Sequence, residues 1–431
     1  MDGPVEPGHD GVGEVAETVA PVRPESDFST RKLKIAFACL VGLMIAGGGF
    51  AQGAIGLVMQ PLQHAFGWGR GEISFALTLM TWASALAMPF VGWRMDKAGA
   101  RKVLLITSAL IGLVTLSLAA TTNSILQFWA SFTVLGLLNA SQVGYTKIIS
   151  GLFTRHRGKA FALFTAESTI VAALLPQLMK VFLLHWGPAG LFVALAAIKL
   201  LLVLPIMIAW LKDPETASGA APEPALLEGE TLGQALRMRE FWLMTLANAG
   251  GGTVIYGLLP HLVPMMQGAG LSLSAAVNAS SLMAVANIVG QLSAGVVIDR
   301  VNTPKVAGAY LCLFLVGVVL ISRASAATGP LPLYAGVILM GLGGGSQMPM
   351  RNYFFTRYFG IKGFAAILST FMSISAVLTA PAPFVIGLIY DRTHSYAGAF
   401  VMFMVAAAIS IVTFFLLPRY RYGGPPATAA A

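Results

Sequence analysis

Long apolar stretches constrain the fold of this chain more than any other feature of its sequence. There are about twelve of them, each about 18 to 28 residues long, and about 20 apolar residues let a helix cross the hydrocarbon core of a bilayer. They do not alternate in polarity as the strands of a membrane barrel do. Only 10% of the 431 residues are charged and 56% are hydrophobic, whereas a soluble chain carries about 25% charged residues. The sequence therefore predicts an all-α integral membrane protein with twelve transmembrane helices.

The charges of the loops predict how these helices are oriented. The predicted spans lie near residues 35–63, 73–95, 103–121, 125–153, 159–184, 188–211, 241–267, 275–298, 305–323, 331–356, 363–389 and 396–418. If the N-terminus is cytoplasmic, nearly all loop Lys and Arg residues fall on that side, and only Arg70, Arg323 and Arg392 fall opposite. This is the positive-inside pattern, so we expect both termini in the cytoplasm. The net charge of +9 then reflects topology rather than a nucleic-acid partner.

The chain contains two copies of one pattern, 203 residues apart. Ala46-Gly47-Gly48-Gly49 recurs as Ala249-Gly250-Gly251-Gly252, and Pro61 recurs as Pro264. Six spans are an even number, so the second copy has the membrane orientation of the first, as in transporters built from parallel repeats. We expect the following organisation: a disordered cytoplasmic tail over 1–30, six-helix bundles over 31–212 and 240–422, a cytoplasmic linker over 213–239, and a short tail over 423–431.

A loop motif takes part in the repeat. Gly92-Trp93-Arg94-Met95-Asp96-Lys97-Ala98-Gly99-Ala100-Arg101-Lys102 lies between the second and third predicted spans, and its weaker second copy keeps Gly295, Asp299, Arg300 and Lys305. With the repeat and the apolar spans, this motif resembles the major facilitator superfamily over residues 30–422. The resemblance implies a cytoplasmic gate that holds the outward-open state through charge pairs. The residues of this expected gate are Gly92, Asp96, Arg101, Asp299 and Arg300.

Two further stretches resemble one branch of that superfamily. Phe66-Gly67-Trp68-Gly69-Arg70-Gly71-Glu72-Ile73-Ser74 is similar to the F-G-W-S-R-x-x-I-S stretch of the monocarboxylate-transporter and oxalate/formate-antiporter-like branch. Tyr145, followed by Phe153-x-Arg155-x-Arg157-Gly158-Lys159-Ala160, is similar to the junction of helices 4 and 5 in that branch. The resemblance implies transport of an organic anion, coupled to protons or to exchange.

Five ionisable side chains fall well inside the predicted spans, namely Lys147, Glu167, Lys180, Lys199 and Arg351. Each costs at least about 2.5–3.5 kcal/mol in the membrane, so each is a functional candidate. By helical rise, Lys147 lies about 12 Å and Glu167 about 15 Å from the cytoplasmic edge, on neighbouring helices. They form either a structural salt bridge, or a site in which Lys147 binds a substrate carboxylate and Glu167 either positions Lys147 or takes a proton.

Equivalent helices of the two copies carry a glutamine and a cation. Gln142 with Lys147, and Gln347 with Arg351, would form an anion clamp across a central cavity, with Arg351 giving a bidentate grip. Alternatively, Arg351 extends to the cytoplasmic interface. Two polar residues of the spans, Tyr145 and Asn287, complete the predicted substrate-binding set.

A histidine adds a second candidate for proton coupling. His261 lies in the seventh predicted span, and histidine is the side chain that ordinarily titrates near neutral pH. It either carries a proton together with Glu167, or is an interface histidine near the outer surface.

These observations predict a secondary active transporter that moves a mono- or dicarboxylate by alternating access. The alternative is a proton-driven drug or metabolite exporter of the same fold. No P-loop motif for ATP is present, and no nucleophile–base constellation indicates an enzyme. We expect a multi-pass monomer in the bacterial inner membrane whose partners are a small organic anion, protons and lipids, with no metal or organic cofactor.

Overall fold

The chain folds almost entirely into helices. The computed structural model describes residues 3, 29–44, 48–121, 124–152, 157–213, 229–301, 303–360, 362–418 and 420–422. Over these ranges it contains no strand, only two isolated bridges. The prediction of an all-α protein is therefore confirmed. Both predicted tails, apart from Gly3, Ser29 and Thr30, lie outside the described residues, as does most of the predicted linker.

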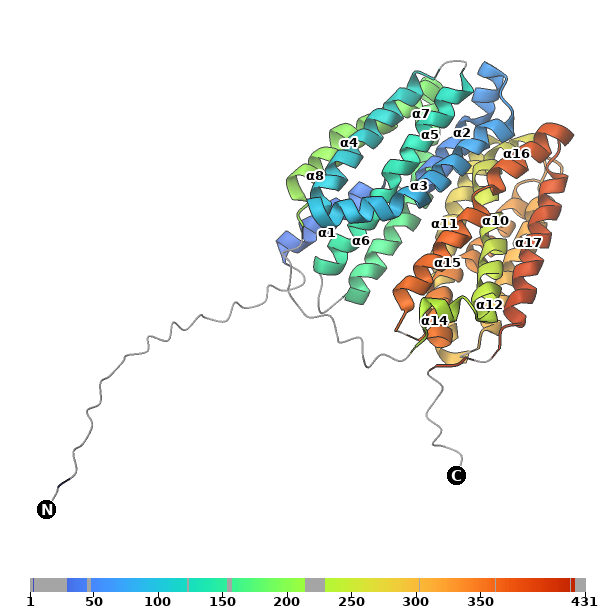
Figure 1. Cartoon of the computed structure of the whole chain (residues 1–431). Helices are drawn as coiled ribbons and strands as arrows, with labels where there is room; N and C mark the ends of the chain where they lie inside the picture. The colour runs from blue at the N-terminus through green and yellow to red at the C-terminus, as the bar shows by residue number, and fades with distance from the viewer. Residues whose placement is uncertain are drawn as a thin grey trace.

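The first half of the chain packs as one group of helices (Figure 1). They are α1 (Thr30–Met44), α2 (Gly48–Phe66), α3 (Arg70–Ala98), α4 (Ala100–Ala119), α5 (Ile125–Asn139), a 3-10 turn (Ala140–Gln142), α6 (Val143–Leu152), α7 (Arg157–Ala197), a π-helical segment (Ile198–Val203) and α8 (Leu204–Trp210). Gly187 interrupts α7 with a φ of 67°, which favours glycine because it has no Cβ. This kink separates the stretches predicted as two spans, 159–184 and 188–211.

The second half forms a second group beside the first (Figure 1). It consists of α9 (Leu232–Ala235), α10 (Arg239–Gly268), α11 (Leu273–Val301), α12 (Lys305–Ser322), α13 (Leu331–Gly345), α14 (Gln347–Phe359), α15 (Phe364–Thr379), α16 (Ala382–Thr393) and α17 (Ala397–Phe415). Ser346 links α13 to α14, so the stretch predicted as one span over 331–356 is helical along its length. The stretch predicted over 363–389 likewise consists of two consecutive helices, α15 and α16.

The surfaces of these helices are apolar, as contact with lipid requires. Leu86, Leu201 and Leu292 are 81%, 78% and 69% exposed. Seven helical segments of the described chain are long and apolar enough to cross a membrane, and they cover Arg70–Met95, Ala100–Ala119, Ala173–Trp210, Leu273–Ile298, Lys305–Ser322, Ala366–Thr393 and Ala397–Phe415. The protein is thus a multi-pass membrane protein, and the number twelve stays a prediction.

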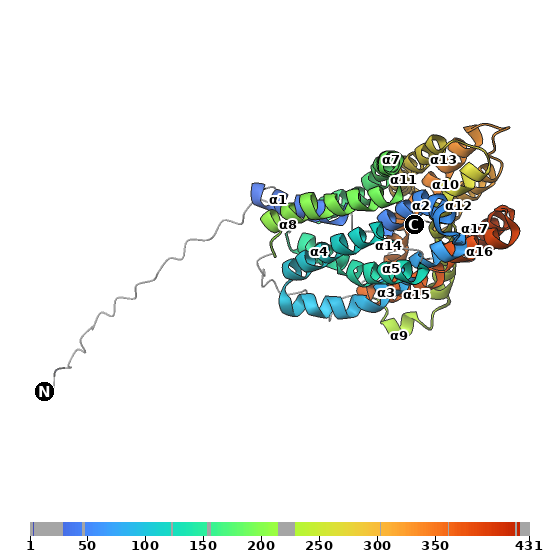
Figure 2. The ribbon, with the colours of Figure 1, turned by 90° about the horizontal axis from the view of Figure 1, so that it is seen from above.

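The two halves meet at one end of the molecule. There α2 packs on α10 and α3 packs on α16, and α7 packs beside α11 (Figure 2). A Cβ on Gly387 of α16 would lie 2.5 Å from the backbone nitrogen of Gly71, so a larger residue there would push α16 away from α3. Toward the end at which α1 begins and α17 ends, the helices of the two halves diverge (Figure 1). We call the closed end the outer end and the other the terminal end.

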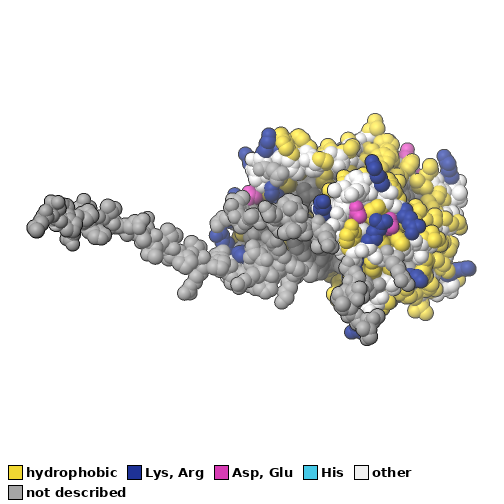
Figure 3. All heavy atoms as spheres, turned by 60° about the horizontal axis from the view of Figure 1, so that its bottom comes forward, with side chains coloured by type: hydrophobic (Ala, Val, Ile, Leu, Met, Phe, Trp, Pro, Cys, Tyr) yellow, Lys and Arg dark blue, Asp and Glu magenta, His cyan; other side chains and the backbone are white. Residues whose placement is uncertain are grey.

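Charged side chains mark the terminal end. Lys and Arg side chains are spread over this face, some of them beside acidic residues (Figure 3). The Arg421 guanidinium lies 3.9 Å from a Glu230 carboxylate oxygen and 3.6 Å from one of Glu240. These contacts join the end of the predicted linker and the start of α10 to the segment that follows α17.

Candidate functional site

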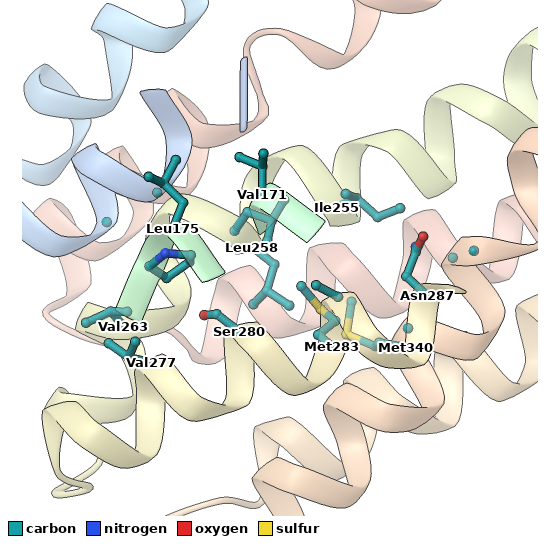
Figure 4. A pocket seen from close by; sticks show the side chains of 18 of the residues that line it. Val171, Leu175, Ile255, Leu258, Val263, Val277, Ser280, Met283, Asn287 and Met340 are labelled. Atoms are coloured by element: carbon teal, nitrogen blue, oxygen red, sulfur yellow. The ribbon is translucent and has the colours of Figure 1, made fainter. Parts of the chain in front are cut away.

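A cavity of about 360 Å³ lies between the two halves, which is within the range of small-molecule sites, about 300–1,000 Å³. We call it the central cavity. Side chains from α2 and α7 of the first half and from α10, α11 and α13 of the second line most of it. Its wall is largely apolar, with Leu258, Met283 and Met340 pointing into it (Figure 4). Such a wall fits the hydrocarbon or ring portion of a ligand.

Polar groups enter the central cavity from one helix, α11. Asn287 lines it, as predicted for a substrate-binding residue, and Gln291 lies one turn further on. The Gln291 side-chain amide donates to the Asn287 side-chain oxygen at 2.7 Å. This bond leaves the Asn287 amide group as a donor and the Gln291 oxygen as an acceptor. A Cβ on Gly345 would lie 2.1 Å from the Asn287 carbonyl oxygen, so the glycine lets α13 approach α11 at this point.

A second, much smaller cavity of about 20 Å³ lies inside the second half. Arg351, Gln347 and Asn248 are among its lining residues. Both cavities are lined from α12 and α14. Phe314 and Met348 line the central cavity, and Leu311 and Gln347 line the small one. We call the small cavity with Gln347 and Arg351 the arginine pocket.

Two donors of the arginine pocket have no acceptor among the described residues. They are the Arg351 Nε and the Gln347 Nε2, and both are buried. Within the described ranges no carboxylate lies within ion-pairing distance of Arg351. Burying a charge or a hydrogen-bond donor without a partner is unfavourable. The pocket is therefore suited to a ligand atom that accepts hydrogen bonds.

The predicted site residues of the first half are spread more widely. Gln142 is half-buried in the 3-10 turn, Tyr145 is buried with its hydroxyl 3.8 Å from the sulfur of Met207, and Lys147 is exposed on α6. The described lining of the central cavity includes none of the three. The Glu167 side chain lies outside the described residues, so its pairing with Lys147 and the clamp with Arg351 both stay predictions.

Lys199, which the sequence left without a role, has a structural one. It is fully buried in the π-helical segment, and its ammonium donates to the Gly42 carbonyl at 2.9 Å. Burying an amine is unfavourable unless it has a hydrogen-bond partner, and the Gly42 carbonyl supplies one. Lys199 therefore joins the π-helical segment to α1.

The predicted gate motif packs within its own half. The Arg101 backbone amide donates to the Asp213 carboxylate at 2.8 Å, and its guanidinium donates to the Ile208 carbonyl at 3.0 Å. Asp213 thus caps the start of α4, where a carboxylate is favoured. From the sequence, Asp213 was assigned to the linker and its role as a helix cap was missed. The position of an acidic residue directly after an apolar span could have indicated that role.

The rest of the predicted gate stays a prediction. Gly92 lies within α3, and Arg300 is exposed near the end of α11. The side chains of Asp96 and Asp299 lie outside the described residues.

The outer end holds a polar cluster that the sequence did not predict. We call it the outer cluster, and its members are Arg70, Ser74, His261, Asp391 and Tyr396. The Asp391 carboxylate accepts from the backbone amide of Arg70 at 2.8 Å and from that of Gly71 at 2.7 Å. The Arg70 guanidinium donates to the Tyr396 hydroxyl and lies 3.6 Å from the centre of the Tyr390 ring. These contacts join α3 to α16 and to the residue before α17.

His261 completes the outer cluster. It is fully buried, with Nε2 located 3.1 Å from the Ser74 hydroxyl and 2.9 Å from the Pro383 carbonyl. Its Nδ1 lies 3.3 Å from the Tyr396 hydroxyl. The predicted proton-coupling histidine is therefore located where the halves close on each other, away from the arginine pocket.

Known proteins support the fold. The sequence model of the family described as Major Facilitator Superfamily matches this chain over residues 41–322 and 278–430. An uncharacterized MFS-type transporter of Bacillus subtilis (strain 168), YcxA, is 24% identical over 379 residues, which cover 83% of this chain and 89% of YcxA. A second one, YhjX of Escherichia coli (strain K12), is 22% identical over 303 residues, which cover 68% of this chain and 73% of YhjX.

Solved structures are similar as well. A bacterial homolog of the human lysosomal transporter Spinster, in an inward-facing and occupied conformation, matches with a TM-score of 0.71 at 14% identity, over 89% of this chain and 95% of that one. A variant of the nucleoside transporter NupG matches with a TM-score of 0.69 at 13% identity, over 89% of this chain and 98% of that one. At these identities the likeness concerns the fold.

Proposed function

The chain belongs to the Major Facilitator Superfamily and is a membrane transporter rather than an enzyme, and we propose that it carries a small organic anion, a mono- or dicarboxylate. In this proposal it works by alternating access as a secondary transporter, coupled to protons or to exchange. Twelve spans, with both termini in the cytoplasm of a bacterial cell, form its two halves. With this orientation, the central cavity would lie between an outer gate that is closed and a cytoplasmic end at which the halves diverge.

The observation that carries this proposal is the unpaired cation of the arginine pocket. Arg351 and Gln347 both present donors without acceptors, and the described residues supply no carboxylate to Arg351. A substrate carboxylate would supply the missing charge and acceptor atoms together, and a guanidinium binds a carboxylate through two parallel hydrogen bonds.

The neighbouring groups support the same proposal. In this proposal, a substrate held by its carboxylate at Arg351 extends toward the central cavity, which is lined in part from the same helices, α12 and α14. Asn287 on α11 has an amide group left for a second polar atom of such a substrate. In this proposal Lys147, with Gln142 and Tyr145 nearby in sequence, adds a second cation from the first half when the halves close at the cytoplasmic end. The likeness to the monocarboxylate and oxalate/formate branch points to the same class of cargo.

One observation favours the alternative, a proton-driven exporter of drugs or metabolites. The wall of the central cavity is largely apolar, with Met179, Met283, Met340 and Met348 among its residues. Flexible methionines suit binding surfaces that accept ligands of different shapes. In an exporter of this kind the ligand fills the central cavity and makes no use of Arg351.

A ligand panel on the purified full-length protein tests the proposal. Matched pairs of a carboxylic acid and its uncharged amide, together with a series of lipophilic cations, are added while the melting temperature is recorded. We expect acids to stabilise the protein and their amides not to, and a ligand at 100 times its Kd stabilises by about 2.7 kcal/mol. If lipophilic cations stabilise the protein and no acid does, the exporter is correct and the anion proposal is wrong.

A further inference from the structure

The hydrogen-bond roles in the outer cluster are fixed by its chemistry. The Pro383 carbonyl can only accept, and the Ser74 hydroxyl already donates to the Arg70 carbonyl at 2.7 Å. Both groups therefore need a proton on Nε2 of His261. In a neutral imidazole the other nitrogen, Nδ1, is then an acceptor.

The hydroxyl of Tyr396 supplies the proton that Nδ1 accepts. Its oxygen receives a hydrogen bond from the Arg70 guanidinium, so its own hydrogen is available to Nδ1 at 3.3 Å. Burial raises the pKa of this phenol above its ordinary value, although Arg70 acts in the opposite direction, so it keeps its proton. The result is a directed chain from Arg70 through Tyr396 to His261 and on to Pro383, in which each donor meets an acceptor.

We propose that Nδ1 of His261 is a proton-binding site whose occupancy decides whether the outer end of the transporter opens. A proton on Nδ1 turns this acceptor into a donor. It then points at a phenol oxygen that already receives a hydrogen bond from a guanidinium, and the phenol hydrogen loses its acceptor. The chain cannot close in the protonated state without losing at least one of its hydrogen bonds.

The charges around His261 act in the same direction. Arg70 is the cation nearest to it along the chain of bonds, and a second positive charge on the imidazole repels it. The one acid of the cluster, Asp391, is occupied by the amides of Arg70 and Gly71. The phenols of Tyr390 and Tyr396 are the other titratable groups that face this site from the second half. Among the described residues no carboxylate lies within ion-pairing distance of His261, so a protonated imidazole has no anion in direct contact with it.

The consequence for transport follows from linkage. If the proton weakens the closed outer end, then closing that end must weaken the binding of the proton by the same factor. The transporter then takes up a proton while its outer end is open and gives it up as the outer cluster forms. This step rests on the proposed transport function, but it does not depend on which substrate is carried.

The distance across the outer end tests this inference without any substrate. In a background with Cys39→Ala and Cys312→Ala, spin labels are placed at Ala65→Cys at the end of α2 and at Ala397→Cys at the start of α17. Both positions are exposed. Electron paramagnetic resonance then measures the label distance in lipid nanodiscs at pH 8 and pH 5. We expect the ratio of open to closed outer ends to rise about tenfold at pH 5, the change that loss of one net hydrogen bond produces.

Three variants assign the response to the outer cluster. His261→Gln keeps an acceptor for Tyr396 and a donor for Pro383 but does not titrate, so we expect the short distance at both pH values. Tyr396→Phe breaks the chain at its centre, so we expect the long distance at both. His64→Gln removes an exposed histidine near the end of α2 and is the matched control that should keep the wild-type response.

The inference is wrong if the wild-type distance is the same at both pH values, or if His261→Gln still responds to acid. If His261→Gln does not fold, the wild-type protein and Tyr396→Phe still test the inference. It is supported if the wild-type distance lengthens at pH 5 and Tyr396→Phe shows the long distance at both pH values, and it is wrong otherwise. Failure here would leave the anion proposal intact, because that proposal depends on Arg351. If no acid stabilises the protein in the ligand panel, the anion proposal fails, but the pH response of the outer end can still be measured because that experiment uses no substrate.

Discussion

Replacing Arg351 with methionine should strengthen the fold and weaken anion binding at the same time. The change removes a buried donor that has no acceptor and a charge that has no carboxylate among the described residues. An unsatisfied buried donor costs about 1–3 kcal/mol. Even a buried ion pair can often be exchanged for apolar residues of similar volume with a neutral or stabilising effect. We therefore expect the free energy of unfolding of the ligand-free protein to rise by about 1–3 kcal/mol.

The effect on binding has the opposite sign. A hydrogen bond to a charged group contributes about 1.5–3 kcal/mol, which corresponds to a Kd about 10- to 150-fold higher in Arg351→Met. Melting of the ligand-free protein gives the first quantity, and titration with the acid found in the ligand panel gives the second. Arg351→Lys keeps the positive charge but cannot form two parallel hydrogen bonds to a carboxylate. Its affinity for the acid should therefore lie between those of the wild type and Arg351→Met.

A control and a refuting result follow from the same physics. Arg323→Met alters an exposed arginine at the end of α12 and should change neither quantity appreciably. A purely structural Arg351 predicts the reverse pattern, a less stable variant with an unchanged Kd. That result would refute both the unpaired state of the guanidinium and its role in substrate binding.

Three more changes test other parts of the molecule. Gly387→Val places a side chain where a Cβ already lies 2.5 Å from the Gly71 nitrogen, so it should hold the outer end open, seen as labelling of a cysteine in the central cavity by an impermeant reagent from outside. Asp213→Ala removes the cap of α4 and should lower stability by about 0.5–2 kcal/mol, whereas Asp213→Asn should retain most of it, as melting temperatures will show. Asp96→Asn should slow transport with little change in substrate Kd, and unchanged transport at normal expression in vesicles would contradict the predicted gate.

The helices were predictable from the sequence because a membrane requires a long apolar run for each of them. The interruption of α7 at Gly187 also falls in the short gap between two predicted spans, 159–184 and 188–211. The charge of Arg351 and its unusual position inside a span identified it as a candidate. The sequence could not give the direction of the Arg351 side chain. That direction determines that Arg351 lines the arginine pocket and not the central cavity.

The outer cluster shows the opposite case. Arg70 and Asp391 are 321 residues apart, and each reads as an ordinary charge at the end of a helix. Only the packing of α3 on α16 brings the Asp391 carboxylate to the first amides of α3. His261 was recognised as a titratable group, but its tautomer depends on Pro383 and Ser74, which no pattern along the chain connects with it.

The two described helices of the first predicted span, α1 and α2, make different contacts. α1 is anchored to the π-helical segment before α8, whereas α2 borders the central cavity with Gly53 and Leu57 and packs on α10 across the halves. A movement of the two halves relative to each other therefore reaches this span through α2. Because Gly53 and Leu57 lie on α2, the same movement would change the shape of the central cavity.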